Sequence, residues 1–444
     1  MILVITKEIE PWFKYIWEQF AMINSLQTEY RLTTYADKSF IDKADLILEY
    51  SISQKYPNSL FIPMKRKFKT DDYIWIREDL PIYRCTIDKD NGYDIFYNAF
   101  VHLSRLEEWE SEKNGKFIHS YSSRHPRKNK KIWKIPIVNF LFNELEAKIK
   151  EKYPAVSFGG KIKPVIEFSH DVDYLEKTCQ LRIKQSLFHI YNSGKLLLHL
   201  KIGKGISKIF SAIEFFIQNR NYWCFDYWTE LEKKFDIKSI YYFFAKSDVS
   251  KGFNLRQWLI DPSYDIMKNN KIKEKCKQLM ANGNRIGLHG SYYSAEDEEI
   301  FLMEKDVLES SLNCEITKTR QHWLNYYEDK TPYIHQSAGI KKDSTIGFND
   351  IPGYRAGIAS EYNPYDHRNQ RGFDYKEIPL VLMDSHLYDY SDGYNMDDIR
   401  WLFDSMNRVK NFAVSINWHQ RVISHDYGWH VKYEELISKI AGIN

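Results

Sequence analysis

Short apolar runs alternate with helical stretches along the second part of the chain, and this alternation limits the folds that the chain can adopt. Helical patterns cover residues 264–281 and 297–312. Strand–helix alternation favours parallel strands joined by crossover helices. Six or seven such units predict an α/β protein with a (β/α)7-type barrel, complete or incomplete, in place of an open sheet. The apolar runs that we expect to be strands are residues 164–169, 239–245, 285–289, 317–322, 377–383 and 412–418.

The first part of the chain follows a different pattern, which predicts a smaller α+β domain of unknown role. Its polar, basic and turn-rich segment at residues 111–131 is expected to be an exposed loop. Pro154 with the following Gly159 and Gly160 marks a boundary, so we expect one domain at 1–154 and a barrel domain at 155–444. We expect strands at residues 1–6, 45–50, 59–63 and 81–86 and helices at 93–109 and 136–153.

A long helical segment at about residues 180–221 stands out as an insertion in the barrel domain. Five lysines lie among its Leu, Ile and Phe residues, at positions 184, 195, 201, 204 and 208. A basic amphipathic helix of this kind can lie on an anionic membrane surface, which would make a membrane a peripheral partner. The same pattern fits a helical lid over the barrel with solvated lysines, and both interpretations stay open.

Composition excludes several classes of protein. The 444 residues include 63 Lys and Arg against 60 Asp and Glu, and the net charge of +3 gives no reason to expect a nucleic-acid partner. Five scattered cysteines without a CxxC pair argue against a disulfide framework or a Cys-based zinc site. Lys7 and Glu8 interrupt the first apolar run, and no stretch of 18 apolar residues occurs, so we expect no secretory signal, no transmembrane helix and a cytoplasmic location.

Polar residues follow the expected strands at their carboxyl ends, which is the edge where barrel proteins place their active sites. In the segment PVIEFSHDVDY, an apolar run leads into Asp171 and Asp173. Residues two apart in extended backbone point to the same side. Such a pair suits one carboxylate that binds a divalent metal ion and a second that acts as a base. A helix N-cap or an Asx-turn would also explain an aspartate here.

Three more strand ends carry histidine. His289 follows the apolar run IGL, and Arg320 and His322 close the next strand two residues apart. One Asp and two His form a ligand set that suits zinc and leaves a position for water. His419 ends the last strand after Trp418, where a histidine can serve as a general acid and the indole ring can wall a sugar pocket. Packing in the core is the alternative for each of these residues.

The order of these groups resembles that of the NodB-homology polysaccharide deacetylases over about two thirds of the chain. The segments SHDVD, GLHGSYYS, RQHWL, PGYRAG and NWHQ are especially similar to a bacterial subgroup that carries HDVD and an extra N-terminal domain. The resemblance implies an irregular NodB-like barrel that binds one divalent metal ion, most often zinc, through one Asp and two His. It also implies a carbohydrate substrate.

The resemblance assigns roles to five residues of this chain. Asp171 corresponds to the base and Asp173 to the metal-binding aspartate. His289 corresponds to the first metal-binding histidine. Arg320 corresponds to the arginine that orients the base, and His419 to the acid that protonates the leaving amine.

The chain departs from the family pattern at two places. Val172 separates aspartates that are adjacent in the family, so the base and ligand roles can be exchanged and both assignments stay open. Tyr293 occupies the position of a second metal-binding histidine. We expect His322, where the family has Pro, to replace that ligand and to complete the metal set with Asp173 and His289.

The predicted function is a metal-dependent hydrolase that removes an acetyl group from an N-acetylated amino sugar of a poly- or oligosaccharide. We expect Trp418, Arg355, Tyr293 and His386 to bind the substrate. The alternative is a catalytically degenerate carbohydrate-binding or scaffold protein in surface-polysaccharide synthesis, which the missing ligand at Tyr293 motivates. A metal-dependent hydrolase of a non-sugar amide is a third interpretation.

Overall fold

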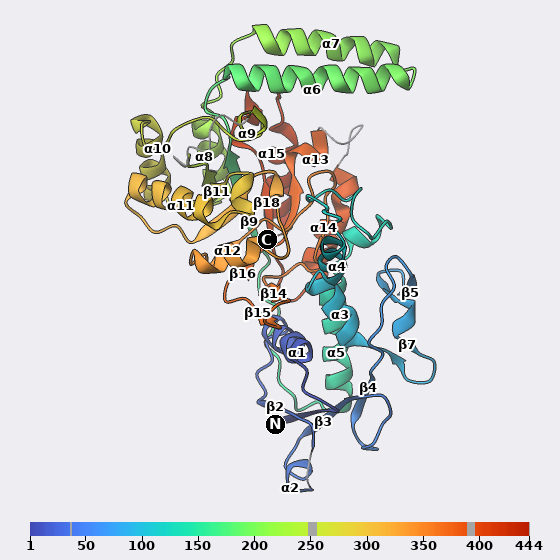
Figure 1. The fold of residues 1–444 in the computed structure, drawn as a ribbon. Coiled ribbons are helices and arrows are strands. Elements are labelled where there is room, and N and C mark those ends of the chain that lie inside the picture. The colour runs from blue at the N-terminus through green and yellow to red at the C-terminus, as the bar shows by residue number, and fades with distance from the viewer. Residues whose placement is uncertain (36–37, 247–254, 389–395, 444) are drawn as a thin grey trace. The chain divides into compact units, whose positions relative to one another are not determined.

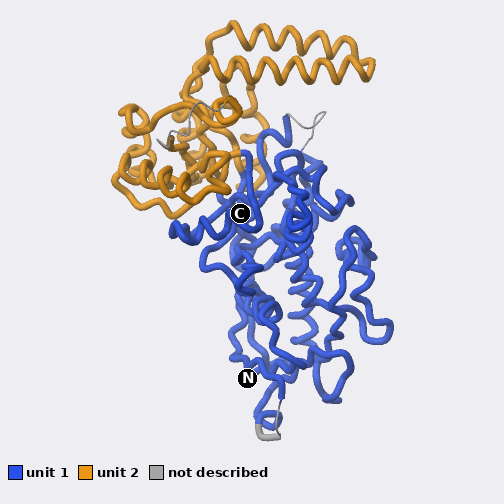
Figure 2. The backbone as a smooth tube through the Cα atoms, viewed as in Figure 1, with its two compact units in different colours: residues 1–167, 323–416 blue, residues 168–322, 417–444 orange. Residues whose placement is uncertain are grey.

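The computed structural model describes residues 1–35, 38–246, 255–388 and 396–443 (Figure 1). The chain divides into two compact units (Figure 2). Unit 1 consists of Met1–Glu167 and Trp323–Ile416, and unit 2 of Phe168–His322 and Asn417–Asn444. This division differs from the boundary expected at residue 154, which stays a prediction.

An eight-stranded sheet in the order β16-β13-β12-β11-β10-β9-β18-β17 confirms the predicted α/β class. The pairings among β9, β10, β11 and β12 and between β13 and β16 are parallel. The order begins at β16 and ends at β17, so the described strands do not close into a ring. The strands are β9 Val165–Val172, β10 Ile240–Phe243, β11 Arg285–Gly290, β12 Lys318–Gln321, β13 Lys342–Asp343, β16 Lys376–Glu377, β17 Leu380–Met383 and β18 Ala413–Asn417.

The central strands of unit 2 form where the sequence has apolar runs, because parallel strands are covered on both faces. Side chains such as Phe168, Tyr241 and Leu288 are buried. Polar side chains at the helix starts satisfy backbone N–H groups that have no partner within the helix, as Asp297 does for the N–H of Ile300. The helices are α6 Cys179–Leu198, α7 Ile202–Ile217, α8 Phe225–Lys233, α9 Leu255–Ile260, α10 Asn270–Ala281, η3 Tyr293–Ala295, α11 Glu298–Leu312, η4 His322–Leu324, η6 Gln420–Ile423 and α15 Val431–Ile443.

The strand register brings chemically active residues to one edge. Tyr242 of β10 pairs with Asp171 of β9, and His289 of β11 pairs with Arg320 of β12. Because parallel strands run in the same direction, these positions all lie near the carboxyl ends of their strands.

The lysine-rich segment of residues 180–221 folds as α6 and α7, which lie side by side in antiparallel directions (Figure 1). An isolated bridge between Glu176 and Asn221 closes the base of this hairpin. Among the described residues, no helix combines the length and the apolar character needed to cross a membrane.

Unit 1 contains a four-stranded sheet in the order β2-β1-β3-β4, in which all three strand pairs are parallel. The remaining elements of the unit are α1 Pro11–Ile23, α2 Lys38–Ile41, η1 Arg84–Thr86, α3 Ile95–Leu103, α4 Leu106–Lys113, η2 Ile132–Lys134, α5 Ile137–Lys152, α12 Thr331–Ser337, α13 Asp384–Tyr388, η5 Met396–Ile399 and α14 Arg400–Arg408, with strands β1 Ile2–Thr6, β2 Tyr30–Thr33, β3 Leu46–Ser51, β4 Leu60–Pro63, β5 Tyr73–Arg77, β6 Leu80–Tyr83, β7 Ile87–Asp88, β8 Gly92–Tyr93, β14 Tyr365–Asp366 and β15 Arg371–Gly372.

The single helix expected at residues 93–109 is two helices, α3 and α4. The chain breaks at Arg105, whose φ of 51° lies in the left-handed region. Its buried guanidinium donates to both carboxylate oxygens of Glu328, at 2.7 and 2.8 Å, and to the hydroxyl groups of Tyr326 and Tyr362. This network of buried partners explains how a non-glycine residue is held in an unfavourable backbone conformation.

The basic segment expected to be an exposed loop is exposed only in part, so that prediction was wrong for its middle. His125 and Arg127 are buried. Arg127 Nε donates to Glu107 Oε2 at 3.0 Å, and its guanidinium lies 4.4 Å from the centre of the Trp133 ring. His125 Nε2 lies 3.2 Å from Glu108 Oε1. Carboxylates from α4 therefore neutralise basic residues that composition alone would leave in solvent.

We expect Arg127→Met to lower the free energy of unfolding by about 3–5 kcal/mol, because the variant leaves the buried Glu107 carboxylate without its partner. Lys130→Met at an exposed position of the same segment is the matched control and should change stability by less than about 0.5 kcal/mol. Urea unfolding followed by tryptophan fluorescence measures both variants. Equal stability of the two would mean that the segment behaves as an exposed loop.

Candidate metal centre

Three potential metal ligands converge near the carboxyl ends of strands in unit 2. Asp173 follows β9 and His289 lies in β11, both labelled in Figure 1, and His322 follows β12. Asp173 Oδ1 lies 3.3 Å from His289 Nε2 and 3.5 Å from His322 Nδ1. The two ring nitrogens are 3.0 Å apart, and all three side chains are buried.

Backbone carbonyl groups fix the tautomers of both histidines. His289 Nδ1 lies 2.9 Å from the carbonyl oxygen of Arg320, and His322 Nε2 lies 3.0 Å from that of Ile260. A carbonyl oxygen can only accept, so each of these nitrogens carries the proton. The opposite nitrogens, His289 Nε2 and His322 Nδ1, then face each other and the Asp173 carboxylate. Burial would lower the pKa of His289, but Asp171 and Asp173 raise it above its usual value, so His289 Nε2 can carry a proton when no metal ion is bound.

This arrangement of acceptors fits a bound cation. Two imidazole nitrogens 3.0 Å apart need a proton or a metal ion between them, because two facing lone pairs would repel one another. Asp173 Oδ1 is buried, and no described donor makes a well-aligned hydrogen bond to it. Ligands at tetrahedral zinc are separated by about 3.4 Å, given metal–ligand bonds of about 2.0–2.1 Å. The observed separations of 3.0, 3.3 and 3.5 Å match that spacing, and one Asp with two His leaves a coordination position open.

Asp171 occupies a separate environment beside this cluster. Arg320 Nη1 donates to Asp171 Oδ1 at 2.9 Å and to Ser169 Oγ at 2.8 Å. Asn417 Nδ2 donates to Asp171 Oδ2 at 2.8 Å. The Arg320 guanidinium lies 4.5 Å from the centre of the Tyr242 ring, a position that favours a cation. The carboxylate of Asp171 is therefore held in one orientation by two fixed donors.

Local charges set the protonation states of the site. Burial alone would raise the pKa of Asp171, but the Arg320 guanidinium holds it below its usual value. Burial would also raise the pKa of Asp173, yet the Arg421 guanidinium keeps it well below the usual range. Burial lowers the pKa of His322 to about 3, so this ring is neutral, as a metal ligand must be.

The Oδ2 atom of Asp173 faces His419 and Arg421. His419 Nε2 lies 3.7 Å from Asp173 Oδ2, and Arg421 Nη1 lies 2.5 Å from the same atom. The His419 side chain is 19% exposed, against 3% for Asp173. His419 therefore stands at the more accessible side of the site, where it can meet a substrate.

The sequence motifs did not single out Asn417 and Arg421, although both lie beside His419 in the segment NWHQR. Asn417 ends β18 two residues before His419, so the period of two along an extended chain was the available signal for it. Arg421 lies in η6, where that period does not apply. A third unexpected residue is Lys184 of α6, which turns inward instead of being solvated. Its Nζ lies 3.4 Å from the Ile260 carbonyl oxygen, and burial lowers its pKa to about 8.

Two residues of the motifs, His170 and Trp418, are buried and form hydrogen bonds with groups outside the ligand cluster. His170 Nδ1 lies 2.7 Å from the Trp418 carbonyl oxygen, and its Nε2 lies 2.9 Å from Glu232 Oε1. Trp418 is fully buried, and its indole N–H donates to the Trp429 carbonyl oxygen at 2.7 Å.

Tyr293 lies in η3 after β11 and is half-buried. Of the residues expected to bind substrate, Tyr293 alone combines a place in unit 2 with partial exposure.

Arg355 and His386, also expected to bind substrate, belong to unit 1. Arg355 is buried, and its nitrogens donate to Glu108, to Ser120 Oγ and to the Gly347 carbonyl oxygen. Both ring nitrogens of the buried His386 are engaged by backbone groups. Arg355 and His386 therefore have no part in the proposed chemistry.

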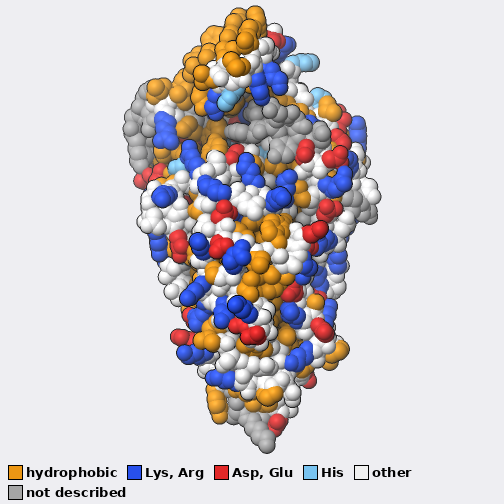
Figure 3. Space-filling model, turned by 90° about the vertical axis from the view of Figure 1, so that its right-hand side faces the viewer, with side chains coloured by type: hydrophobic (Ala, Val, Ile, Leu, Met, Phe, Trp, Pro, Cys, Tyr) orange, Lys and Arg blue, Asp and Glu red, His pale blue; other side chains and the backbone are white. Residues whose placement is uncertain are grey.

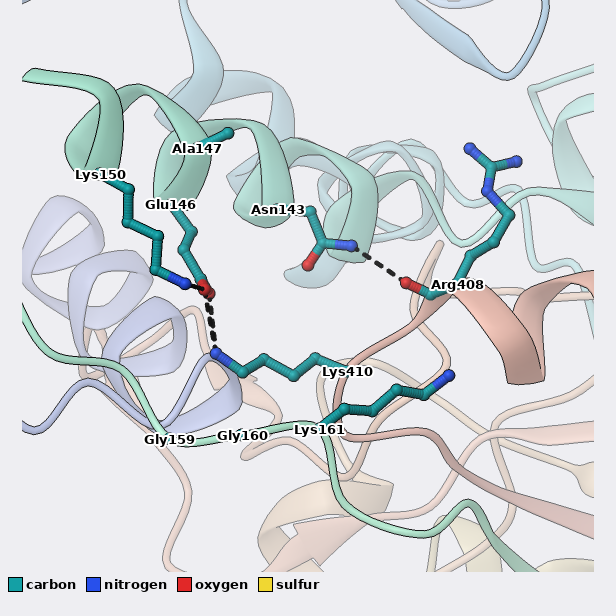
Figure 4. Close-up of a pocket in the computed structure, with 9 residues that line it drawn as sticks. All are labelled: Asn143, Glu146, Ala147, Lys150, Gly159, Gly160, Lys161, Arg408 and Lys410. Atoms are coloured by element: carbon teal, nitrogen blue, oxygen red, sulfur yellow. Dashed lines mark hydrogen bonds and ion pairs between the residues drawn. The ribbon is translucent and has the colours of Figure 1, made fainter. Parts of the chain in front are cut away.

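A hollow of about 390 Å³ in unit 1 contains none of the predicted site residues (Figure 4). Its basic side chains already have partners in its wall. Glu146 neutralises Lys150 and Lys410, and Lys161 donates to the carbonyl oxygens of Met406 and Asn407. The hollow therefore offers little uncompensated charge to an anionic ligand.

Part of the chain matches a protein family, and the chain is similar to several solved structures. Residues 2–154 match the model of a family of unknown function (DUF7033), and no match was found among curated proteins. A solved structure from Mycobacterium smegmatis, described as a polysaccharide deacetylase, is 14% identical with a TM-score of 0.36, over 64% of this chain and 86% of that one. A CE4-family pseudoenzyme from Bacillus anthracis is 10% identical with a TM-score of 0.26, over 65% and 63%. A mutant of it with restored enzymatic activity is 9% identical with a TM-score of 0.28, over 65% of each chain.

We expect the purified protein to bind about one zinc ion per chain and His322→Ala to lose most of that binding, because the variant leaves only two protein ligands. His419→Ala should keep the metal, since His419 faces the other oxygen of Asp173. His425→Ala at an exposed position is the control. Calorimetric zinc titration of the metal-free protein distinguishes the variants, and full affinity in His322→Ala would remove this residue from the ligand set.

Proposed function

We propose that this chain is a metal-dependent hydrolase that removes the acetyl group from an N-acetylated amino sugar of a poly- or oligosaccharide. The observation that carries the proposal is the set of three converging acceptor atoms on Asp173, His289 and His322. A separately held carboxylate, Asp171, and an accessible histidine, His419, lie beside them. The order of these residues along the chain, which resembles that of the NodB-homology deacetylases, supports the choice of substrate class.

The metal would be held by Asp173, His289 and His322. When bound, a divalent ion supplies polarisation of the acetyl carbonyl group and a water molecule of lowered pKa. Zinc suits the one-carboxylate, two-imidazole donor set best.

Asp171 is the general base in this proposal, and it takes the proton from the attacking water. Its ionised state and its orientation are maintained by Arg320 and Asn417. Asp173 is less suited to that role, because its Oδ1 faces the two histidines and its Oδ2 faces Arg421. This difference between the two aspartates supports one of the two assignments that the sequence leaves open.

His419 is the general acid in this proposal, and it gives a proton to the amine as the C–N bond breaks. An amine leaves poorly as an anion, so the proton must arrive as the bond breaks. The partial exposure of His419 and its position beside Asp173 Oδ2 support this role. O-linked acetyl groups need less protonation of the leaving group and are a chemically close substrate.

A non-catalytic carbohydrate-binding protein is the second candidate. It is favoured by the ion pair between Arg421 and Asp173, which places a fixed positive charge 2.5 Å from Oδ2 of this ligand residue. A cation so close to the centre weakens metal binding. This alternative predicts a protein that stays metal-free in excess zinc and releases no acetate from any acetylated sugar.

We expect Asp171→Asn to lower kcat for acetate release from N-acetylated amino-sugar oligomers by at least about a hundredfold, because the general base is lost. Zinc stoichiometry should be unchanged. Asp236→Asn, on an exposed turn with a left-handed backbone that Asn also tolerates, is the matched control. Full activity in Asp171→Asn would transfer the base role to another residue.

We expect His419→Ala to impair amide substrates far more than an aryl acetate. The phenolate of an aryl acetate leaves without a proton, so an acid contributes little to its hydrolysis. The loss in kcat for the amide should be about a hundredfold or more. Parallel rates on both substrates measure the effect. An equal loss on the two substrates would mean that His419 positions other groups and does not act as the acid.

A further inference from the structure

The α6–α7 hairpin presents its large apolar side chains to solvent. On α7 they recur every three or four residues, which places them on one face of the helix. Phe210 is 68% exposed and Ile217 is 71% exposed. The exposed apolar residues of this face include Ile202, Ile206, Ile209, Phe210, Ile213 and Ile217. α6 has a corresponding face with Leu187, Ile190, Tyr191 and Leu198.

Small side chains form the seam between the two helices. Ser186 Oγ donates to the Ala212 carbonyl oxygen at 2.9 Å, and Ser193 Oγ donates to that of Gly205 at 2.7 Å. The helices approach so closely that a Cβ atom at Gly205 would lie 2.7 Å from Leu197. A water-soluble helix pair normally buries its large apolar residues at this seam. Small residues at the seam with large apolar residues outside are typical of helices that pack in lipid.

The apolar faces of the two helices lie on one side of the hairpin. Each residue of an α-helix turns about 100° around the helix axis. By this measure, the apolar face of each helix lies about a quarter turn past the side that forms the seam, and the sense of rotation is the same in both helices. For two antiparallel helices, equal rotations from the seam point to the same side. Figure 3 shows hydrophobic side chains gathered on the hairpin, in the uppermost part of the view. The two faces thus form one surface, which is the apolar face of the hairpin.

The outer part of the hairpin is basic. Residues 195–217 contain Lys195, Lys201, Lys204 and Lys208 against the single acidic residue Glu214. Lys204 and Lys208 lie on sides of α7 away from the apolar face, and Lys195 and Lys201 lie near the turn between the helices. An apolar face combined with a lysine-rich polar face is the pattern of helices that lie in the interface of an anionic membrane.

We infer that the α6–α7 hairpin binds the surface of an anionic lipid bilayer. The apolar face enters the boundary between headgroups and acyl chains, and the lysines lie at the level of the lipid phosphates. No described helix can span the bilayer, so the binding is peripheral. A second copy of the chain fits less well, because pairing two hairpins brings like charges together. This inference is independent of the proposed deacetylase activity.

Flotation of the full chain with lipid vesicles tests the inference. We expect the protein to float with vesicles that contain phosphatidylglycerol and not with vesicles of phosphatidylcholine alone. The combined variant Ile206→Ser, Phe210→Ser, Ile213→Ser and Ile217→Ser should lower the partition coefficient at least about tenfold. Replacing Lys195, Lys201 and Lys204 by Gln should lower it on the order of a hundredfold.

The matched control replaces three exposed apolar residues of unit 2 outside the hairpin, Leu255, Met267 and Val431, by Ser, and it should bind vesicles normally. Circular dichroism checks that all variants fold. Failure of the wild type to float with anionic vesicles would overturn the inference, as would equal flotation with both lipid compositions. Sedimentation that shows a dimer lost only in the four-serine variant, without vesicle binding, would assign the apolar face to self-association. Acetate release from a soluble substrate is a separate readout and should stay unchanged in the four-serine variant.

Discussion

The arrangement of the candidate site depends on one buried carboxylate. Asp173 lies among two imidazole rings and an arginine, and each of its oxygen atoms serves a different set. A buried carboxylate is stable only when its charge is compensated. Arg421 compensates one oxygen through an ion pair, and the other faces the imidazole nitrogens of His289 and His322. The electrostatic demand of this second oxygen is what makes a cation the natural partner of the site.

The surrounding chain is organised to keep those donors in place. The parallel register sets His289 beside Arg320, so one strand supplies the carbonyl group that fixes the ring of its neighbour. Gly290 follows directly, and a Cβ atom there would lie 2.4 Å from the Gln321 side chain. The glycine therefore leaves room for the Gln321 side chain just beyond the ligand. A group that bonds to one ring nitrogen, as the Arg320 carbonyl does for His289, determines which nitrogen stays available to a metal ion.

Sequence patterns predicted the parts of the molecule that depend on local periodicity. The apolar runs gave the strands of the sheet, and the spacing of two placed Asp171 with Asp173 and Arg320 with His322. The family resemblance implied that Arg320 orients Asp171. Local patterns could not show that Asn417 would also contact Asp171, because that contact depends on how distant strands align. The prediction of an exposed loop was wrong for the middle of residues 111–131 for a related reason. Arg127 is buried with Glu107, which comes from the preceding helix α4. Burial of a charge is decided by the partner and cannot be read from the charged residue alone.

The fixed tautomers of His289 and His322 have a consequence for folding. Because both rings already point their other nitrogen inward, a metal ion would meet a prearranged set of ligands and would stabilise only the folded arrangement of these strands. The free energy of binding then adds to the free energy of unfolding by mass action. Without the ion, a proton on His289 Nε2 can take its place between the two rings and the Asp173 carboxylate. A metal ion then competes with this proton, and a chelator acts on the conformational stability of unit 2 as well as on its chemistry.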